Sequence, residues 1–189
     1  MNALMIDIET LGLNPVSNVH QIGFCAANLR TGNYILLPTN IYVRPAAGTF
    51  TDFDTVCWWM QQSDAARKAV FSPEVERITM ADAFMELKNA YEFIGGKDGG
   101  ATVWASPAMF DMPILTFSFG QARPDLRESK PWPYYMERDL MTLYKMLDPE
   151  KKLKPTNPVE HDAASDAKAQ MDHLIAIFQA NPQILEGAK

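Results

Sequence analysis

Acidic residues of the kind that bind metal ions occur at three places along this chain of 189 residues. The first is Asp7-Ile8-Glu9, within an apolar stretch that is typical of a β-strand. Alternate side chains of a strand share a face, so we expect Asp7 and Glu9 to point one way while Ile6 and Ile8 point into the core. Two adjacent carboxylates repel each other unless a cation neutralises them. The tripeptide therefore suits either a metal site or two solvated acids at the end of a strand.

Two further segments each place a carboxylate at the expected start of a helix. Asp111 follows a short apolar strand by six residues, and Asp166 ends the segment HDAASD (161–166). Considered singly, each aspartate is typical of a helix N-terminal acid, and a lone histidine is more often structural. Asp162 and Ser165 suit caps or surface groups. The small residues between them would let the helix pack closely against the sheet.

Considered together, four carboxylates from separate segments predict a metal site: Asp7, Glu9, Asp111 and Asp166. Oxygen ligands suit Mg²⁺ or Mn²⁺, whereas a zinc site would need more nitrogen or sulfur ligands. Two such ions about 3.5–4 Å apart could stabilise the attacking and leaving oxygens of an in-line displacement at phosphorus. His161, with an ordinary pKa of about 6.5, could take the proton from the attacking water. The set predicts a nuclease that hydrolyses phosphodiester bonds.

The composition is that of an ordinary globular chain, and it narrows the classes of function. With 47% hydrophobic and 21% charged residues, we expect one domain over residues 1–189. Cys25 and Cys57 alone cannot form a disulfide framework or a four-ligand zinc site, which favours a reducing, cytoplasmic setting. No signal peptide or run of roughly 18 apolar residues is seen, so we expect no membrane association. A net charge of −6 disfavours binding of nucleic acid by charge alone, but bound cations could replace a basic patch.

The elements that must position these residues alternate between strands and helices. We expect strands at 3–8, 19–29, 33–44 and 101–105, a strand or turn near 136–140, and a hairpin turn at Thr31-Gly32. We expect helices at 54–69, at 79–94 between Thr79 and Gly95-Gly96, from about 110, before Pro149, and at 163–180. Loops are expected at 120–135 and 148–160. The order βββααβαβαα favours an α/β sheet with helices on its faces.

The three acidic motifs resemble those of a known family. DIET (7–10), the FD of WASPAMFD (104–111) and HDAASD (161–166) are similar in order and spacing to the three Exo motifs of the DEDDh 3′–5′ exonucleases. Trp58-Trp59 and RDLMTL (138–143) further resemble small bacterial and phage members, which include mycobacterial exoribonuclease-like proteins and phage exodeoxyribonuclease VIII-like domains. The resemblance extends from residue 5 to about 178. It implies a ribonuclease H-like fold, with helices on both faces of a mixed five-stranded sheet whose second strand is antiparallel to the rest.

The resemblance also implies a reaction and a site. The expected reaction is hydrolysis at single-stranded 3′ ends of DNA or RNA, with release of nucleoside 5′-monophosphates. His161 would be the general base, and two Mg²⁺ or Mn²⁺ ions would be bound by Asp7, Glu9, Asp111 and Asp166.

Contacts with the substrate are expected close to the first motif. By the resemblance, Thr10 and Leu11 would lie against the terminal nucleotide. Neighbouring helix positions cannot share a face, so at least one of Trp58 and Trp59 should be core while the other could stack a base; we assign Trp59 to the substrate. The turn Ala105-Ser106-Pro107 departs from the more glycine- or asparagine-like turn of many relatives, which bears on substrate fit rather than on metal binding.

Other interpretations stay open at this point. A non-catalytic nucleic-acid-binding module on the same fold is disfavoured by the complete set of five residues. A phosphatase with Asp7 as covalent nucleophile would need a second Asp where Glu9 stands. The lysines at 151, 152 and 154 either attract a phosphate backbone or form a solvated loop. The sequence settles neither DNA against RNA nor whether the chain forms a homodimer.

Overall fold

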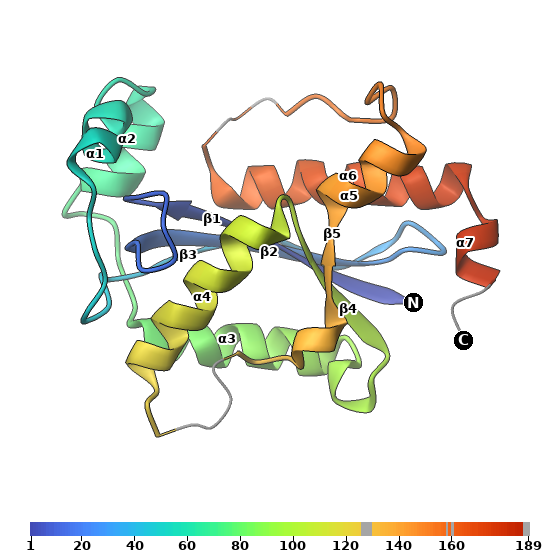
Figure 1. The fold of residues 1–189 in the computed structure, drawn as a ribbon, viewed down its shortest axis with the longest axis horizontal. Coiled ribbons are helices and arrows are strands. Elements are labelled where there is room, and N and C mark those ends of the chain that lie inside the picture. Colours follow the sequence, from blue (N-terminus) through green and yellow to red (C-terminus); the bar gives the residue numbers. More distant parts are fainter. Residues whose placement is uncertain (126–129, 158, 160, 187–189) are drawn as a thin grey trace.

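One mixed five-stranded sheet forms the centre of the molecule (Figure 1). The computed structural model describes residues 1–125, 130–157, 159 and 161–186. The strands are β1 (Asn2–Thr10), β2 (Val19–Asn28), β3 (Tyr34–Tyr42), β4 (Ala101–Ala105) and β5 (Glu137–Asp139). They lie in the order β3-β2-β1-β4-β5, in which β2 is antiparallel to β1 and β3 while β4 is parallel to β1 and β5. This confirms the predicted sheet with an antiparallel second strand.

Helices cover both faces of this sheet, as the sequence predicts. The helices are α1 (Phe53–Trp59), α2 (Asp64–Phe71), α3 (Met80–Phe93), α4 (Ala108–Ala122), α5 (Leu140–Leu147), α6 (Ala163–Ala180) and α7 (Gln183–Glu186), with short 3₁₀ turns η1 (Gly96–Asp98) and η2 (Tyr134–Met136). In Figure 1, α5 and α6 lie on one side of the sheet and α3 and α4 on the other. α1 and α2 lie beside one end of the sheet.

The central strand β1 is buried on both of its faces. Leu4, Ile6 and Ile8 belong to the core cluster under α3 and α4, whereas Ala3 and Met5 belong to the cluster under α6. Burial on both faces is the usual state of a central strand between two helical layers. This explains why β1 is continuously apolar over residues 3–6, before the two acids Asp7 and Glu9 near its end.

The local signals for turns and caps are confirmed where the chain changes direction. Thr79 caps α3, and its hydroxyl and the side chain of Asp82 form a reciprocal capping box. Gly95 follows α3 with φ of 92°, and Gly32 in the first hairpin has φ of 75°. Both angles lie in the left-handed region that glycine adopts without steric cost.

The prediction of a single helix over 54–69 is wrong. The segment forms α1 and α2, separated at residues 60–63. Ser63 is the cause, because its side-chain oxygen accepts a hydrogen bond from the Ala66 amide at 3.2 Å and starts a new helix. The short helix α7 was also not expected. Residues 126–129, 158 and 160 of the two expected loops lie outside the described residues.

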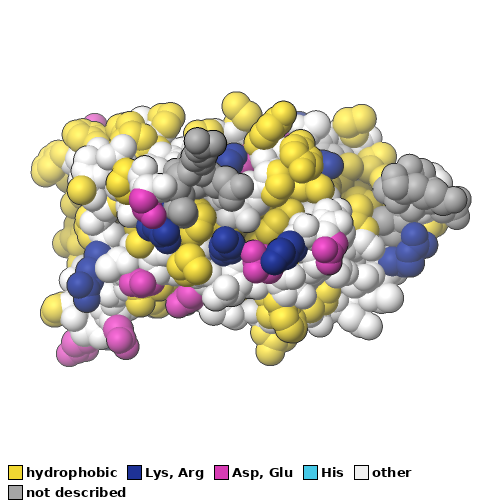
Figure 2. Space-filling view, turned by 90° about the horizontal axis from the view of Figure 1, so that it is seen from below, with side chains coloured by type: hydrophobic (Ala, Val, Ile, Leu, Met, Phe, Trp, Pro, Cys, Tyr) yellow, Lys and Arg dark blue, Asp and Glu magenta, His cyan; other side chains and the backbone are white. Residues whose placement is uncertain are grey.

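The face seen in Figure 2, on the side of α3, carries mixed charge. Lysine and arginine side chains lie among aspartate and glutamate side chains, with hydrophobic groups between them. The described residues on this face form no continuous basic surface for a polyanion. In the described part of the chain, we find no helix with the length and hydropathy to cross a bilayer.

Candidate active site

Strand β1 presents the first two carboxylates on the side of the sheet that α6 covers. Asp7 and Glu9 alternate with Ile6 and Ile8, which are buried in the opposite core cluster at 0% and 4% exposure. The predicted division of this strand into an acidic and an apolar face is therefore confirmed. Both acids are partly buried, in contrast to the alternative of two solvated acids.

Helix α6 reaches this face because β2 carries a glycine opposite Asp7. In the sheet Asp7 pairs with Gly23. A Cβ atom at Gly23 would lie 1.9 Å from the carbonyl carbon of Ala163 and 2.3 Å from the amide nitrogen of Ala164. The first turn of α6 thus rests directly on the sheet beside Asp7. The small residues before Asp166 allow this approach, as the sequence predicts.

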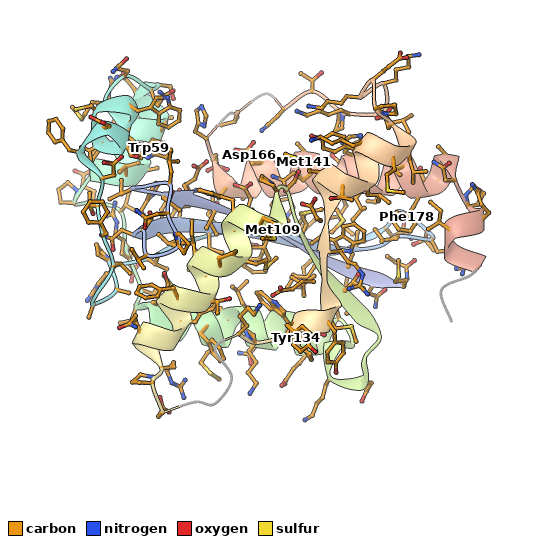
Figure 3. The ribbon with its side chains drawn as sticks, viewed as in Figure 1. Trp59, Met109, Tyr134, Met141, Asp166 and Phe178 are labelled. Carbon is orange, nitrogen blue, oxygen red and sulfur yellow. The ribbon has the colours of Figure 1, made fainter. Side chains whose placement is uncertain are left out.

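Three of the predicted ligands meet at the end of β1. Asp7, Glu9 and Asp166 each offer one carboxylate oxygen, and these oxygens lie within 4.8 Å of one another. Figure 3 shows Asp166 on α6, above the sheet. Residues 159 positions apart in the sequence are therefore brought within reach of a single cation.

The fourth carboxylate, Asp111, is the most deeply buried of the set. It lies in the first turn of α4 at 2% exposure, and its Oδ1 accepts a hydrogen bond from the Ile8 amide at 3.2 Å. Its Oδ2 is buried and has no hydrogen-bond partner among the described residues. A buried oxygen without a partner is destabilising unless a ligand satisfies it.

Burial raises the pKa values of all four acids, and repulsion within the set adds to this for Asp7 and Glu9. Burial first, and then the charges of its three neighbouring carboxylates, raise the pKa of Asp7 well above its usual value. Burial and the nearby acids raise the pKa of Glu9 to about 8, and burial raises the pKa of Asp111 to about 7. Burial also raises the pKa of Asp166, opposed by the hydrogen bond from Asn157 and the charge of His161. Near neutral pH the cluster therefore retains protons unless cations displace them.

These residues fit divalent metal ions with a preference for oxygen. Clustered carboxylates of raised pKa, one of them with an unpartnered buried oxygen, are the donor set that Mg²⁺ or Mn²⁺ prefers. An acid that only stabilises a helix N-terminus is usually exposed to solvent. Asp111 is buried and Asp166 is partly buried, so a role at the helix end alone does not explain them.

His161 lies beside the carboxylates in a constrained turn immediately before α6. Its φ is 62°, in the left-handed region that is unfavourable for a side chain with a Cβ. Its ring packs edge-on against Trp58 at 4.8 Å and Trp59 at 6.0 Å between ring centroids. Its charge lowers the pKa of Asp166, which places the imidazole next to the acidic cluster. This is a position from which it can exchange a proton with a group bound there.

The expected substrate contacts divide into buried and accessible residues. A cavity of about 510 Å³ borders Glu9, and its lining includes Thr10, Leu13, Phe110 and both tryptophans, Trp58 and Trp59. Thr10 is 6% exposed. Leu11 packs instead against the small core cluster that contains Trp59.

The two tryptophans differ in burial. Trp59 is 1% exposed, and its Nε1 donates a hydrogen bond to the Thr10 carbonyl at 2.8 Å, so it supports the strand end rather than offering a free ring. Trp58 is 42% exposed and lines the cavity. The expectation that one of the pair is core is confirmed, but the buried residue is the one that we assigned to the substrate.

Sequence reasoning missed the residues that hold the carboxylates. Gln170 donates to Asp7 Oδ1 at 2.7 Å, and Asn157 donates to Asp166 Oδ1 at 2.7 Å. Gln170 lies four residues after Asp166 and so shares its helix face, a spacing that could have revealed it. Asn157 lies in a loop and gave no such signal.

Asp162 anchors the start of α6. Its side chain accepts from the Ser165 amide at 3.0 Å, which confirms it as a cap. It also accepts from Gln21 at 3.1 Å and from Asn40 at 2.7 Å, which join the helix to β2 and β3. These bonds fix the helix end that carries Asp166.

Comparison with known proteins assigns both a family and a fold. Residues 2–178 match the family model described as the 3′-5′ exoribonuclease Rv2179c-like domain. A search of curated protein sequences finds no significant match.

Solved structures of exonuclease I are similar in fold. The zinc-bound E. coli ExoI–ssDNA complex has a TM-score of 0.68 at 18% identity, over 98% of this chain and 42% of that one. E. coli exonuclease I with a dT13 oligonucleotide has a TM-score of 0.66 at 17% identity, over 98% and 42%. Exonuclease I from Methylocaldum szegediense has a TM-score of 0.62 at 16% identity, over 97% and 41%. The chain thus spans less than half the length of these proteins, and the likeness confirms the ribonuclease H-like fold.

Proposed function

The chain belongs to the Rv2179c-like 3′-5′ exoribonuclease domain family, and on this premise we propose that it is a metal-dependent exonuclease that removes nucleotides from single-stranded 3′ ends. The observation that carries the proposal is the acidic cluster, in which the oxygens of Asp7, Glu9 and Asp166 lie within 4.8 Å of one another beside buried Asp111. Such a cluster destabilises the folded chain unless cations bind there. A module that only binds nucleic acid does not need a cluster of carboxylates that lowers its stability. The cluster therefore disfavours a non-catalytic nucleic-acid-binding module.

In the proposed reaction the four carboxylates hold two Mg²⁺ or Mn²⁺ ions. The ions, when bound, stabilise the charge on the scissile phosphate and favour ionisation of the attacking water. His161 takes the proton from that water, whose oxygen forms a new bond to phosphorus. The bond from phosphorus to the O3′ of the preceding nucleotide breaks, and that O3′ gains a proton. The products are a nucleoside 5′-monophosphate and a strand shorter by one residue.

Two features near the carboxylates support this arrangement. Gln170 and Asn157 each donate to a carboxylate oxygen of the cluster and so restrict its orientation. The edge-on contacts of His161 with Trp58 and Trp59 hold the imidazole in a defined position. Groups held in place before the substrate arrives lose little entropy during the reaction.

The terminal base is proposed to enter the cavity that borders Glu9. Trp58 is the exposed ring there, so we transfer the proposed stacking role from Trp59 to Trp58. Thr10 and Leu13 complete the walls near the base. The proposed contact of Leu11 with the nucleotide rests on the resemblance alone.

The test follows the direction and metal dependence of hydrolysis. With Mn²⁺, a 5′-labelled single strand should give a ladder of shortened products, whereas a 3′-labelled strand should release labelled mononucleotide from the start. Asp7→Ala should lower the rate about 1,000-fold or more, since several kcal/mol of metal-dependent stabilisation are lost. Glu86→Ala, an exposed acid on α3, is the matched control and should act like the wild type.

Two outcomes would refute the proposal. Hydrolysis that Asp7→Ala leaves unchanged would exclude this site, and strand binding without Mn²⁺-dependent hydrolysis would establish the non-catalytic alternative. The rates of hydrolysis of an RNA strand and a DNA strand of the same sequence, measured side by side, determine which sugar the enzyme prefers. The family description favours RNA, whereas the structural neighbours named above include complexes with ssDNA or an oligonucleotide.

We also propose a cellular location, a domain organisation and an oligomeric state for the chain. A cytoplasmic location is supported by Cys25 and Cys57, which are both free thiols. Action of residues 1–189 as a single domain is supported by the one sheet that joins most elements. A homodimer is tested by light scattering of the purified chain.

A further inference from the structure

A second cavity borders the acidic cluster on the side of α5. It has a volume of about 230 Å³, and Asp166 and Gln170 form part of its wall. Figure 3 shows Met141 of α5 near Asp166, and both residues line this cavity. The acidic cluster therefore lies between two cavities, of which the first borders Glu9 and the second borders Asp166.

The two cavities differ in chemistry. The first is lined by the aromatic rings of Trp58 and Phe110 and suits a base. The lining of the second includes Lys151 and Lys154 together with Asn157. Within the described part of the chain neither of these two ammonium groups forms a salt bridge.

The neighbouring lysine is arranged differently. Lys152 does not line the cavity, and its ammonium pairs with Glu150 at 2.7 Å on the open surface. The three lysines of this loop, which the sequence could not distinguish, are thus divided by the structure into two that face the cavity and one that does not.

The loop that carries the two lysines is held in a fixed conformation. Asp148 accepts hydrogen bonds from the amides of Lys152 at 2.9 Å and Leu153 at 3.0 Å. Asp148 is itself bound by His173 of α6 at 2.9 Å, and both side chains are buried. Lys151 has φ of 53° and its ammonium lies 5.0 Å from the centre of the Tyr144 ring. A side chain held in an unfavourable backbone region often marks a ligand contact.

We infer that Lys151 and Lys154 form a subsite for a backbone phosphate of the strand upstream of the scissile bond. This rests on the proposed exonuclease function, because a strand with its last base in the first cavity must continue past the carboxylates. Two ammonium groups there offset the repulsion between a phosphate and the acids, which the net charge of −6 otherwise strengthens. The subsite thus makes the enzyme prefer strands over mononucleotide esters.

The test compares two substrates that differ in upstream backbone. A 5′-labelled single strand has upstream phosphates, whereas the p-nitrophenyl ester of thymidine 5′-monophosphate has none. We expect the double variant K151A/K154A to raise KM for the strand about tenfold at 0.1 M salt with kcat little changed. The slope of log KM against log salt should fall by about 0.7, because one phosphate contact on a single strand contributes about 0.7. Hydrolysis of the ester should be unchanged.

Lys152→Ala is the matched control and should behave as the wild type on both substrates. A strand with one uncharged methylphosphonate linkage then locates the contact. Wild type should lose affinity when that linkage lies in the subsite, and the double variant should show no further loss at the same position. Inhibition by free thymidine 5′-monophosphate should be equal in all variants, which separates a strand phosphate from a bound product.

Several results would overturn the inference. A double variant that matches Lys152→Ala on the strand would show that the lysines are only solvated. An equal loss on the strand and on the ester would place the lysines at the reacting phosphate instead. If wild type hydrolyses neither substrate, the proposed function fails, but anisotropy of a labelled strand in Ca²⁺ still measures whether K151A/K154A weakens binding.

Discussion

Replacing Gly23 by alanine should separate Asp166 from the other carboxylates without changing any of them. The new Cβ would lie 1.9 Å from the Ala163 carbonyl carbon and 2.0 Å from its oxygen, and neither backbone atom can rotate away. Ordinary van der Waals contact begins at 3.4 Å, so α6 and β2 must separate by about 1.5 Å. Since Asp166 lies three residues after Ala163 in the same helix, it moves with that turn. A displacement of about 1 Å in an active site lowers the rate about 100-fold.

The assay measures kcat on the p-nitrophenyl ester, the Mn²⁺ needed for half-maximal activity, and thermal stability. Overpacking of this kind costs about 3 kcal/mol, which should lower Tm by roughly 6–12 °C in a chain of this length. Gly32→Ala is the control: it strains φ of +75° and meets Gln179 near the other end of α6, far from the acids. It should lose stability but keep kcat. If Gly23→Ala instead keeps wild-type kcat and Mn²⁺ dependence, the close approach at Gly23 does not position Asp166.

Four further predictions concern individual groups of the site. The raised pKa of Glu9, about 8 against about 4.3 when unfolded, means that the folded metal-free state binds the extra proton. The stability of the metal-free protein should therefore decline as pH rises from about 4 to about 8. Mn²⁺ should raise Tm more at pH 8 than at pH 6, and equal rises in Tm at the two pH values would contradict this. Gln170→Ala should weaken metal affinity about 10–100-fold while saturating Mn²⁺ restores kcat, as read from a metal titration of activity. Trp58→Ala should raise KM on strands, since base stacking contributes about 1–3 kcal/mol, and should also lower kcat because the Trp58 ring packs against His161. Trp59→Ala should chiefly lower Tm, and the reverse pattern would make Trp59 the stacking ring. His161→Ala should lower kcat about 10²–10⁴-fold but keep the Mn²⁺-induced rise in Tm, and loss of that rise would make the imidazole a ligand instead.

The sequence predicted the elements well where local physical rules act alone. The apolar run before Asp7 marked the central strand, and Thr79 marked the start of α3, because strand burial and helix capping depend on neighbours in the chain. The rule failed at Ser63, where good helix formers on both sides concealed a second cap. Propensity summed over a window does not reveal an interruption of four residues.

The candidate ligands were also accessible from sequence, although only as a set. Strand alternation alone was enough to place Asp7 and Glu9 on one face of β1. Asp111 and Asp166 gained meaning from their order and spacing, since each one alone resembles a helix N-terminal acid.

The sequence by itself therefore identified the candidate ligands, the acidic and apolar faces of β1 and the family motifs. Each of these follows from the periodicity or spacing of residues along the chain. Only the tertiary structure decided which groups meet: Trp58 is exposed while Trp59 is buried, Gln170 and Asn157 hold the acids, and two lysines of one loop line a cavity with Asp166. These facts depend on the approach of α6 to Gly23. That approach is a steric relation between segments about 140 residues apart, and local rules of strand and helix formation do not contain it.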